Sequence, residues 1–112
     1  MKRFLILVLF TASLALAQQP AQPRVIEITA KRFEFAPNVV TLRRGEAVTI
    51  RLTALDRAHG LLVKPLGIDL DAGRGDPDGI TITPSAAGSF PAICDHYCGM
   101  GHGNMKMTFV VE

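Results

Sequence analysis

Residues 47–54 read Ala-Val-Thr-Ile-Arg-Leu-Thr-Ala, and this stretch decides the fold class. Its apolar and polar side chains alternate with a period of two, so a β-strand formed here can bury one face and expose the other. The same alternation returns at 25–30, 78–84 and 106–112, and further strands are expected at 39–43, 59–64 and 89–94. No window shows a convincing helical period. The pattern predicts an all-β chain folded as an antiparallel sandwich or barrel.

The length and composition fit one small domain. The chain has 112 residues, of which 48% are hydrophobic and 20% are charged, so it can bury a core. Aromatic residues make up only 6% and Trp is absent, which argues against stacking platforms for nucleic acid. The sequence also lacks a Gly-rich phosphate loop. Nucleic acids and nucleotides are therefore not expected as partners.

Residues 1–17 are typical of a secretory signal. Lys2 and Arg3 precede an apolar stretch that ends in an Ala-x-Ala cleavage site at 15–17. The stretch is shorter than a bilayer span, so cleavage after Ala17 is favoured over a membrane anchor. The predicted organisation is a signal at 1–17, a linker at 18–23 and a domain at 24–112. Cleavage leaves ten basic and ten acidic residues, no membrane span in the mature chain, and a location in the periplasm or on the outer face of the cell envelope.

Side chains able to bind a soft metal gather between the last two predicted strands. The run from Cys94 to Met105 holds both cysteines, two of the three histidines and two of the four methionines, and His59 opens an earlier strand. Thiolate and imidazole donors select copper or zinc, and an added thioether favours copper. In an exported protein a Cys-x-x-x-Cys pair also fits a disulfide. A disulfide, however, does not require the histidines and the methionine around it.

The spacing Cys94-x-x-x-Cys98-Gly99-x-x-His102-x-x-Met105 resembles the binuclear copper A motif of cytochrome c oxidase subunit II and nitrous oxide reductase. The similarity extends over most of residues 25–112. It implies a cupredoxin-like fold, which is a single-domain Greek-key β-sandwich or barrel.

The same resemblance implies a complete ligand set for two copper ions. Two thiolates would bridge the metals, each metal would receive one imidazole, and a thioether and a main-chain carbonyl would be weak ligands. The implied ligands are His59, Cys94, the carbonyl of His96, Cys98, His102 and Met105. Asp56 lies three residues before His59, as in the family's Asp-x-x-His, and would hold the His59 region in place from outside the ligand set.

Two features depart from the oxidase pattern. His96 stands where the oxidase has Glu, so the magnesium site that this Glu serves is not expected here. The oxidase's electron-entry patch uses Trp, which this chain lacks, so the usual cytochrome c docking surface is not carried over.

The sequence thus predicts an exported, monomeric electron carrier with a binuclear copper A-type centre. Its partner would be another redox protein, either a cytochrome or a copper protein. One alternative is a mononuclear blue copper site built from His59, Cys98, His102 and Met105, and another is a protein for copper trafficking or storage. An enzyme is not expected, because no nucleophile–base pair stands out and the copper ligands leave no open position for a substrate.

Overall fold

The computed structural model describes residues 22–94 and 105–112, and nearly all elements in this part are β-strands. They are β1 (Arg24–Lys31), β2 (Glu34–Ala36), β3 (Val39–Leu42), β4 (Val48–Ala54), β5 (His59–Val63), the 3-10 turn η1 (Lys64–Leu66), β6 (Ile68–Ala72), β7 (Asp78–Ile82), β8 (Gly88–Ile93) and β9 (Lys106–Val111). No helix among the described residues has the length and apolar character needed to cross a bilayer. The all-β prediction is confirmed, whereas the expected leader lies outside the described residues.

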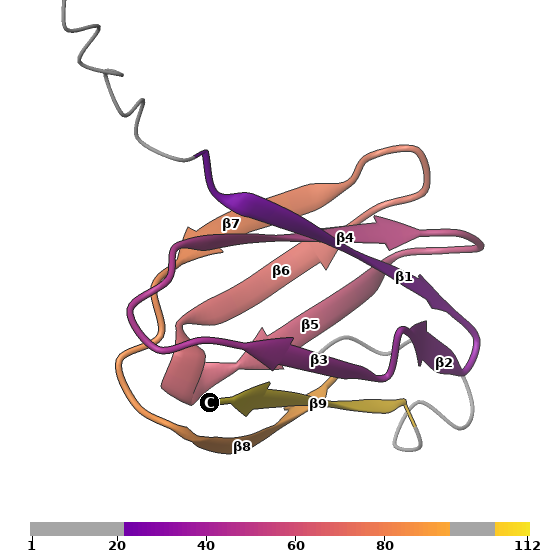
Figure 1. Ribbon diagram of the computed structural model, residues 1–112. Coiled ribbons are helices and arrows are strands. Elements are labelled where there is room, and N and C mark those ends of the chain that lie inside the picture. Colours follow the sequence, from indigo (N-terminus) through magenta and orange to yellow (C-terminus); the bar gives the residue numbers. More distant parts are fainter. Residues whose placement is uncertain (1–21, 95–104) are drawn as a thin grey trace, which may run out of the picture.

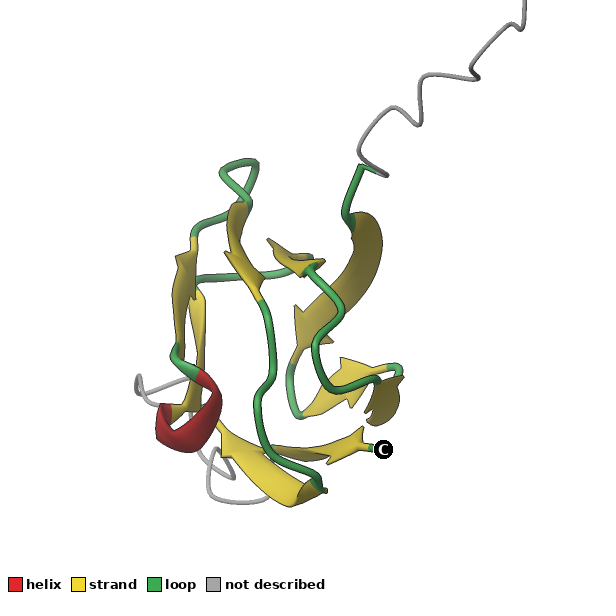
Figure 2. Cartoon of the chain, turned by 60° about the vertical axis from the view of Figure 1, so that its left-hand side comes forward, coloured by secondary structure: helices red, strands yellow, loops and turns green. Residues whose placement is uncertain are grey.

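The strands form two facing sheets. One sheet has the order β2-β1-β4-β7 and the other has the order β3-β9-β8-β5-β6. Figure 1 shows the two layers, and Figure 2 shows the strands around the interior with η1 as a helical turn at one end. The predicted sandwich is therefore confirmed.

The prediction of purely antiparallel pairing is wrong at two strand pairs. β1 runs parallel to β4, and β3 runs parallel to β9. After β1 and β2 the chain crosses to the second sheet as β3 and then returns as β4 beside β1. A return of this kind places sequentially distant strands side by side in the same direction, whereas a tight hairpin would make neighbours antiparallel.

The alternating residues fill the space between the sheets, as the period of two predicts. Ile28, Ile50 and Phe109 are fully buried on β1, β4 and β9. Ile80 and Ile82 on β7 are only half-buried, because β7 is the edge strand of its sheet.

Two strands were missed by the sequence prediction. β2 has only three residues, which is too short for a periodic pattern to show. β6 alternates buried Ile68, Leu70 and Ala72 with exposed aspartates, so the signal was present in the sequence. Elsewhere the predicted ends shift by one or two residues; the strand expected at 78–84, for example, ends at Ile82.

Candidate metal centre

His59 is the first residue of β5 and is fully buried. It is the buried polar side chain of the described core, whose other members are apolar. It lies at the end of the second sheet where β8 ends and β9 begins, because β8 is hydrogen-bonded to both β5 and β9. A buried imidazole needs hydrogen bonds or another polar partner to offset its desolvation.

The carboxylate of Asp56 supplies a partner for one nitrogen of the His59 ring. Nε2 of His59 lies 2.6 Å from Oδ1 of Asp56. Asp56 also accepts hydrogen bonds from the main-chain N–H groups of Arg32 and Arg57, each at 2.8 Å. Burial raises the pKa of Asp56, but these three hydrogen bonds and the attraction of the imidazole outweigh it and lower the pKa to about 2. Asp56 is therefore ionised at neutral pH and acts only as an acceptor.

The other ring nitrogen of His59 has no partner among the described residues. Nδ1 is buried and makes no hydrogen bond within residues 22–94 and 105–112. Because the ionised carboxylate accepts at Nε2, the neutral ring carries its proton there and leaves a lone pair on Nδ1. An imidazole with one nitrogen held by a carboxylate and the other bare is arranged as a metal-binding histidine is arranged.

Cys94 and Met105 lie at the same end of the sheet as His59. β8 and β9 are antiparallel, and their last described pair is Ile93 with Lys106. Cys94 and Met105 occupy the next position of this register, directly after β8 and directly before β9. Both are buried, at 4% and 1% exposure, because they continue the inward-facing alternation of their strands. Three of the predicted ligands therefore come from adjacent strands.

The other three predicted ligands, His96, Cys98 and His102, lie outside the described residues. Within residues 22–94 and 105–112, no three His, Cys, Asp or Glu side chains form a group able to hold a metal. Cys94 is disulfide-bonded, so its sulfur is described in the oxidised state. A bond from Cys94 to a metal requires the reduced thiolate.

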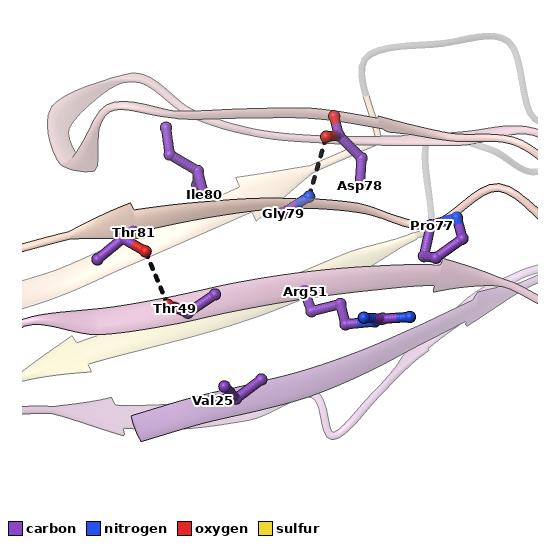
Figure 3. Close-up of a pocket in the computed structure, with 8 residues that line it drawn as sticks. All are labelled: Val25, Thr49, Arg51, Pro77, Asp78, Gly79, Ile80 and Thr81. Atoms are coloured by element: carbon purple, nitrogen blue, oxygen red, sulfur yellow. Dashed lines mark hydrogen bonds between the residues drawn. The ribbon is translucent and has the colours of Figure 1, made fainter. Parts of the chain in front are cut away.

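A groove of about 340 Å³ lies away from these residues, on the outer face of the first sheet (Figure 3). Gly79 on β7 lies opposite Arg51 on β4, and its lack of a side chain leaves space for the groove. A Cβ at Gly79 would come within 3.2 Å of the Ile50 carbonyl oxygen. Arg51 is paired with Glu27, at 3.3 Å between Nε and Oε1. The groove is lined by Val25, Thr49, Arg51, Pro77, Asp78, Gly79, Ile80 and Thr81. It contains none of the predicted ligands.

Comparison with known families decides what kind of protein this is. The model of the cupredoxin-like domain matches residues 3–111. The chain belongs to this family. The fold expected from the copper A resemblance is thereby confirmed, since the two-sheet sandwich is the architecture that the resemblance implied.

Individual relatives of this cupredoxin-like domain agree with that assignment. Cytochrome c oxidase subunit 2 of Thermus thermophilus is 29% identical over 98 residues, which are 88% of this chain and 73% of that protein. The periplasmic domain of cytochrome oxidase subunit II (CoxB) of Bradyrhizobium japonicum superimposes with a TM-score of 0.74 at 18% identity, covering 83% of this chain and 86% of that one.

A blue copper protein is also similar in structure. Auracyanin A of Chloroflexus aurantiacus superimposes with a TM-score of 0.64 at 20% identity, covering 81% of this chain and all of that one. At these identities, the likeness to solved structures shows the fold alone. The comparisons relate this cupredoxin domain to cytochrome c oxidase subunit II. They leave open whether its copper site is binuclear or mononuclear.

The sequence did not single out Arg32 as part of this site. Its main-chain N–H reaches Asp56 across 24 positions of the chain. Because every residue other than proline carries this donor, no side-chain pattern could have revealed it.

Proposed function

We propose that this protein is an exported electron carrier with a binuclear copper A-type centre. The observation that carries the proposal is the state of His59: its Nδ1 is buried and has no partner in the described part of the chain, while its Nε2 is hydrogen-bonded to Asp56. A buried nitrogen without a hydrogen bond costs about 1–3 kcal/mol, and a metal bond at that nitrogen would remove this cost.

The kinds of donor support copper as the metal. Thiolate, imidazole and thioether together suit copper, whereas zinc sites use cysteine, histidine and carboxylate and seldom methionine. Met105 is 1% exposed, although Met107, two residues further, is also buried and serves the core. The cupredoxin fold and the relationship to subunit II point to the same metal.

The binuclear form is supported by the presence of two cysteines at the copper A spacing. In this proposal the two copper ions would be held by the thiolates of Cys94 and Cys98 and by the imidazoles of His59 and His102. The weak ligands are Met105 and the carbonyl of His96. Bound copper supplies the ability to take up and release one electron. The side chains of His59, Cys94 and Met105 lie at the ends of β5, β8 and β9 in a packed sandwich, so the positions of these three should change little between the two redox states.

The oxidised state of Cys94 sets a condition for loading. The disulfide must first accept two electrons and two protons, which a dithiol reductant supplies as it becomes a disulfide itself. We place this step outside the cell membrane, because residues 1–17 have the pattern of a secretory signal and a related oxidase domain is periplasmic.

Electron paramagnetic resonance of the reduced, copper-loaded and then partly oxidised protein tests the binuclear form. We expect the unpaired electron to couple to two equivalent copper nuclei, because two thiolate bridges spread it over both metals. The sample should be purple, with about as much copper as cysteine. Coupling to a single copper nucleus would show that the site is of the mononuclear blue type instead. Ready release of colourless Cu(I) would favour a protein for copper transport.

The proposed partner is a redox protein that docks at the His59 end through apolar contacts. Five large apolar side chains are exposed in the described part of the chain, and the strand registers and the hydrogen bonds of the β1–β2 turn put four of them at that end: Phe33, Val39, Leu55 and Ile93. The fifth, Val25, lies at the opposite end of the parallel pair β1–β4. Apolar and aromatic residues are enriched at the centres of protein interfaces.

A pair of matched substitutions tests this docking surface. Leu55 and Val25 are almost equally exposed, at 53% and 56%. We expect Leu55→Lys to slow electron exchange with a soluble c-type cytochrome about tenfold, equivalent to about 1.4 kcal/mol of docking free energy. Val25→Lys adds the same charge far from His59 and should leave the rate unchanged. Stopped-flow kinetics gives both rates, and equal rates for the two variants would place the docking surface elsewhere.

A further inference from the structure

The turn between β1 and β2 makes a long-range contact with the residues around His59. The main-chain N–H of Arg32, in this turn, donates to Oδ2 of Asp56 at 2.8 Å, and the two residues are 24 positions apart. A second bond joins the same segments, from the N–H of Leu55 to the carbonyl oxygen of Ala30 at 2.9 Å. The end of β1 therefore lies directly against the β4–β5 connection.

The three hydrogen bonds of Asp56 are divided unequally between its two oxygens. Oδ1 accepts from the main chain of Arg57 and from Nε2 of His59, and both donors lie within three residues of Asp56. Oδ2 accepts from Arg32. The terminal torsion of an aspartate is broad, so bonds to one oxygen leave the plane of the carboxylate poorly defined. The bond from Arg32 is the one that fixes this plane.

We infer that the β1–β2 turn is a positioning element for the metal-binding histidine. The N–H of Arg32 orients the Asp56 carboxylate, which keeps the proton of His59 on Nε2 and thereby leaves Nδ1 bare for a metal. The role belongs to the main chain of Arg32, and its side chain is exposed and replaceable. The importance of the bare Nδ1 rests on the proposed function, but the tautomer itself is a property of the metal-free protein.

Nuclear magnetic resonance of the reduced, copper-free protein tests the inference without any metal. Long-range proton–nitrogen correlation spectra distinguish a protonated ring nitrogen from a bare one, and His59→Leu identifies the signals of His59. We expect His59 to carry its proton on Nε2 alone. In Asp56→Asn, the amide protons of both Arg32 and Arg57 should move upfield, because the side-chain amide nitrogen cannot accept a hydrogen bond and the remaining oxygen is a neutral, weaker acceptor than a carboxylate.

Three further variants separate the main chain of Arg32 from its side chain. Arg32→Ala keeps the N–H and should preserve the tautomer and the copper affinity. Arg32→Pro removes the N–H and should give a mixture of tautomers and a copper affinity lower by up to about tenfold, the low end of the range for partners of metal ligands. Leu55→Pro is the matched control, since it removes the other bond between the same segments but none to Asp56. It should keep the wild-type tautomer.

Several results would overturn the inference. One is a proton on Nδ1 of His59 in the wild-type protein, and another is a tautomer and copper affinity in Arg32→Pro equal to those of the wild type. If Arg32→Pro does not fold, the test is the amide proton resonance of Arg32 in Asp56→Asn. A resonance equal to that of the wild type would contradict the hydrogen bond from Arg32 to Asp56. The proposed function fails separately, when a protein with the expected tautomer does not bind copper.

Discussion

Replacing Cys94 with serine is expected to halve the copper content and to change the electron paramagnetic resonance spectrum from coupling with two copper nuclei to coupling with one. Serine removes one proposed bridge, while His59, Cys98, His102 and Met105 remain to hold a single metal. The protein should still fold, because Cys94 lies at the end of the sandwich, just beyond β8. Metal analysis of the reduced and reloaded variant, together with its spectrum, measures the effect.

Ala92→Ser is a suitable control for this substitution. Ala92 lies two residues earlier, on the same inward face of β8, and is fully buried. It therefore reports what a buried hydroxyl costs on this strand without touching a proposed ligand, and its copper content should equal that of the wild type. If Cys94→Ser kept the full copper content and the purple colour, Cys94 would not be a bridge. In a mononuclear protein, the wild type would already contain a single copper.

Replacing His59 with leucine is expected to remove most of the stabilisation by copper while changing the stability of the copper-free protein little. Leucine loses the bond to Asp56, worth about 1.5–3 kcal/mol, but it also removes the unpartnered Nδ1, which costs about 1–3 kcal/mol. The free energy of unfolding of the reduced, copper-free variant should therefore lie within about 1 kcal/mol of the wild-type value. Copper at a hundredfold excess over its dissociation constant should add about 2.7 kcal/mol to the free energy of unfolding of the wild type. It should add much less to that of His59→Leu.

Leu61→Ala gives the contrast that makes the His59 result informative. Leu61 is on the same strand, two residues further, and is also fully buried. Deleting its side chain leaves a cavity and should cost about 2–5 kcal/mol in the copper-free protein, with the increment from copper retained. Urea unfolding of the reduced proteins with and without copper measures both quantities. If the free energy of unfolding of copper-free His59→Leu fell as much as that of Leu61→Ala, His59 would be an ordinary core residue.

The sandwich strands were predictable because their signal is local. Alternation in 25–30, 47–54 and 106–112 places Ile28, Ile50 and Phe109 on inward faces, and the structure buries all three. The parallel pairing of β1 with β4 and of β3 with β9 was not predictable in this way. Whether two strands pair in parallel or antiparallel depends on how the connections cross between the sheets. The alternation of apolar and polar residues is the same for both directions of a strand.

Most of the ligand candidates were predictable because they follow one another at a characteristic spacing in the sequence, from Cys94 to Met105. For His59, Cys94 and Met105 the structure adds burial and a common end of one sheet. For His96, Cys98 and His102, which lie outside the described residues, the assignment remains a prediction from the spacing and the resemblance.

The sequence by itself determined the types of donor, their spacing and the alternation that makes the strands, since each of these depends only on residues near one another in the chain. Tertiary structure alone decided that His59 is buried with a bare Nδ1, and that the main chain of Arg32 reaches Asp56. Every residue except proline has a main-chain N–H, so the sequence does not distinguish that of Arg32. Folding gives it a particular role by bringing it 2.8 Å from the Asp56 carboxylate. Burial likewise results from packing two whole sheets together, which excludes water from the His59 ring and leaves a nitrogen that a metal can bind.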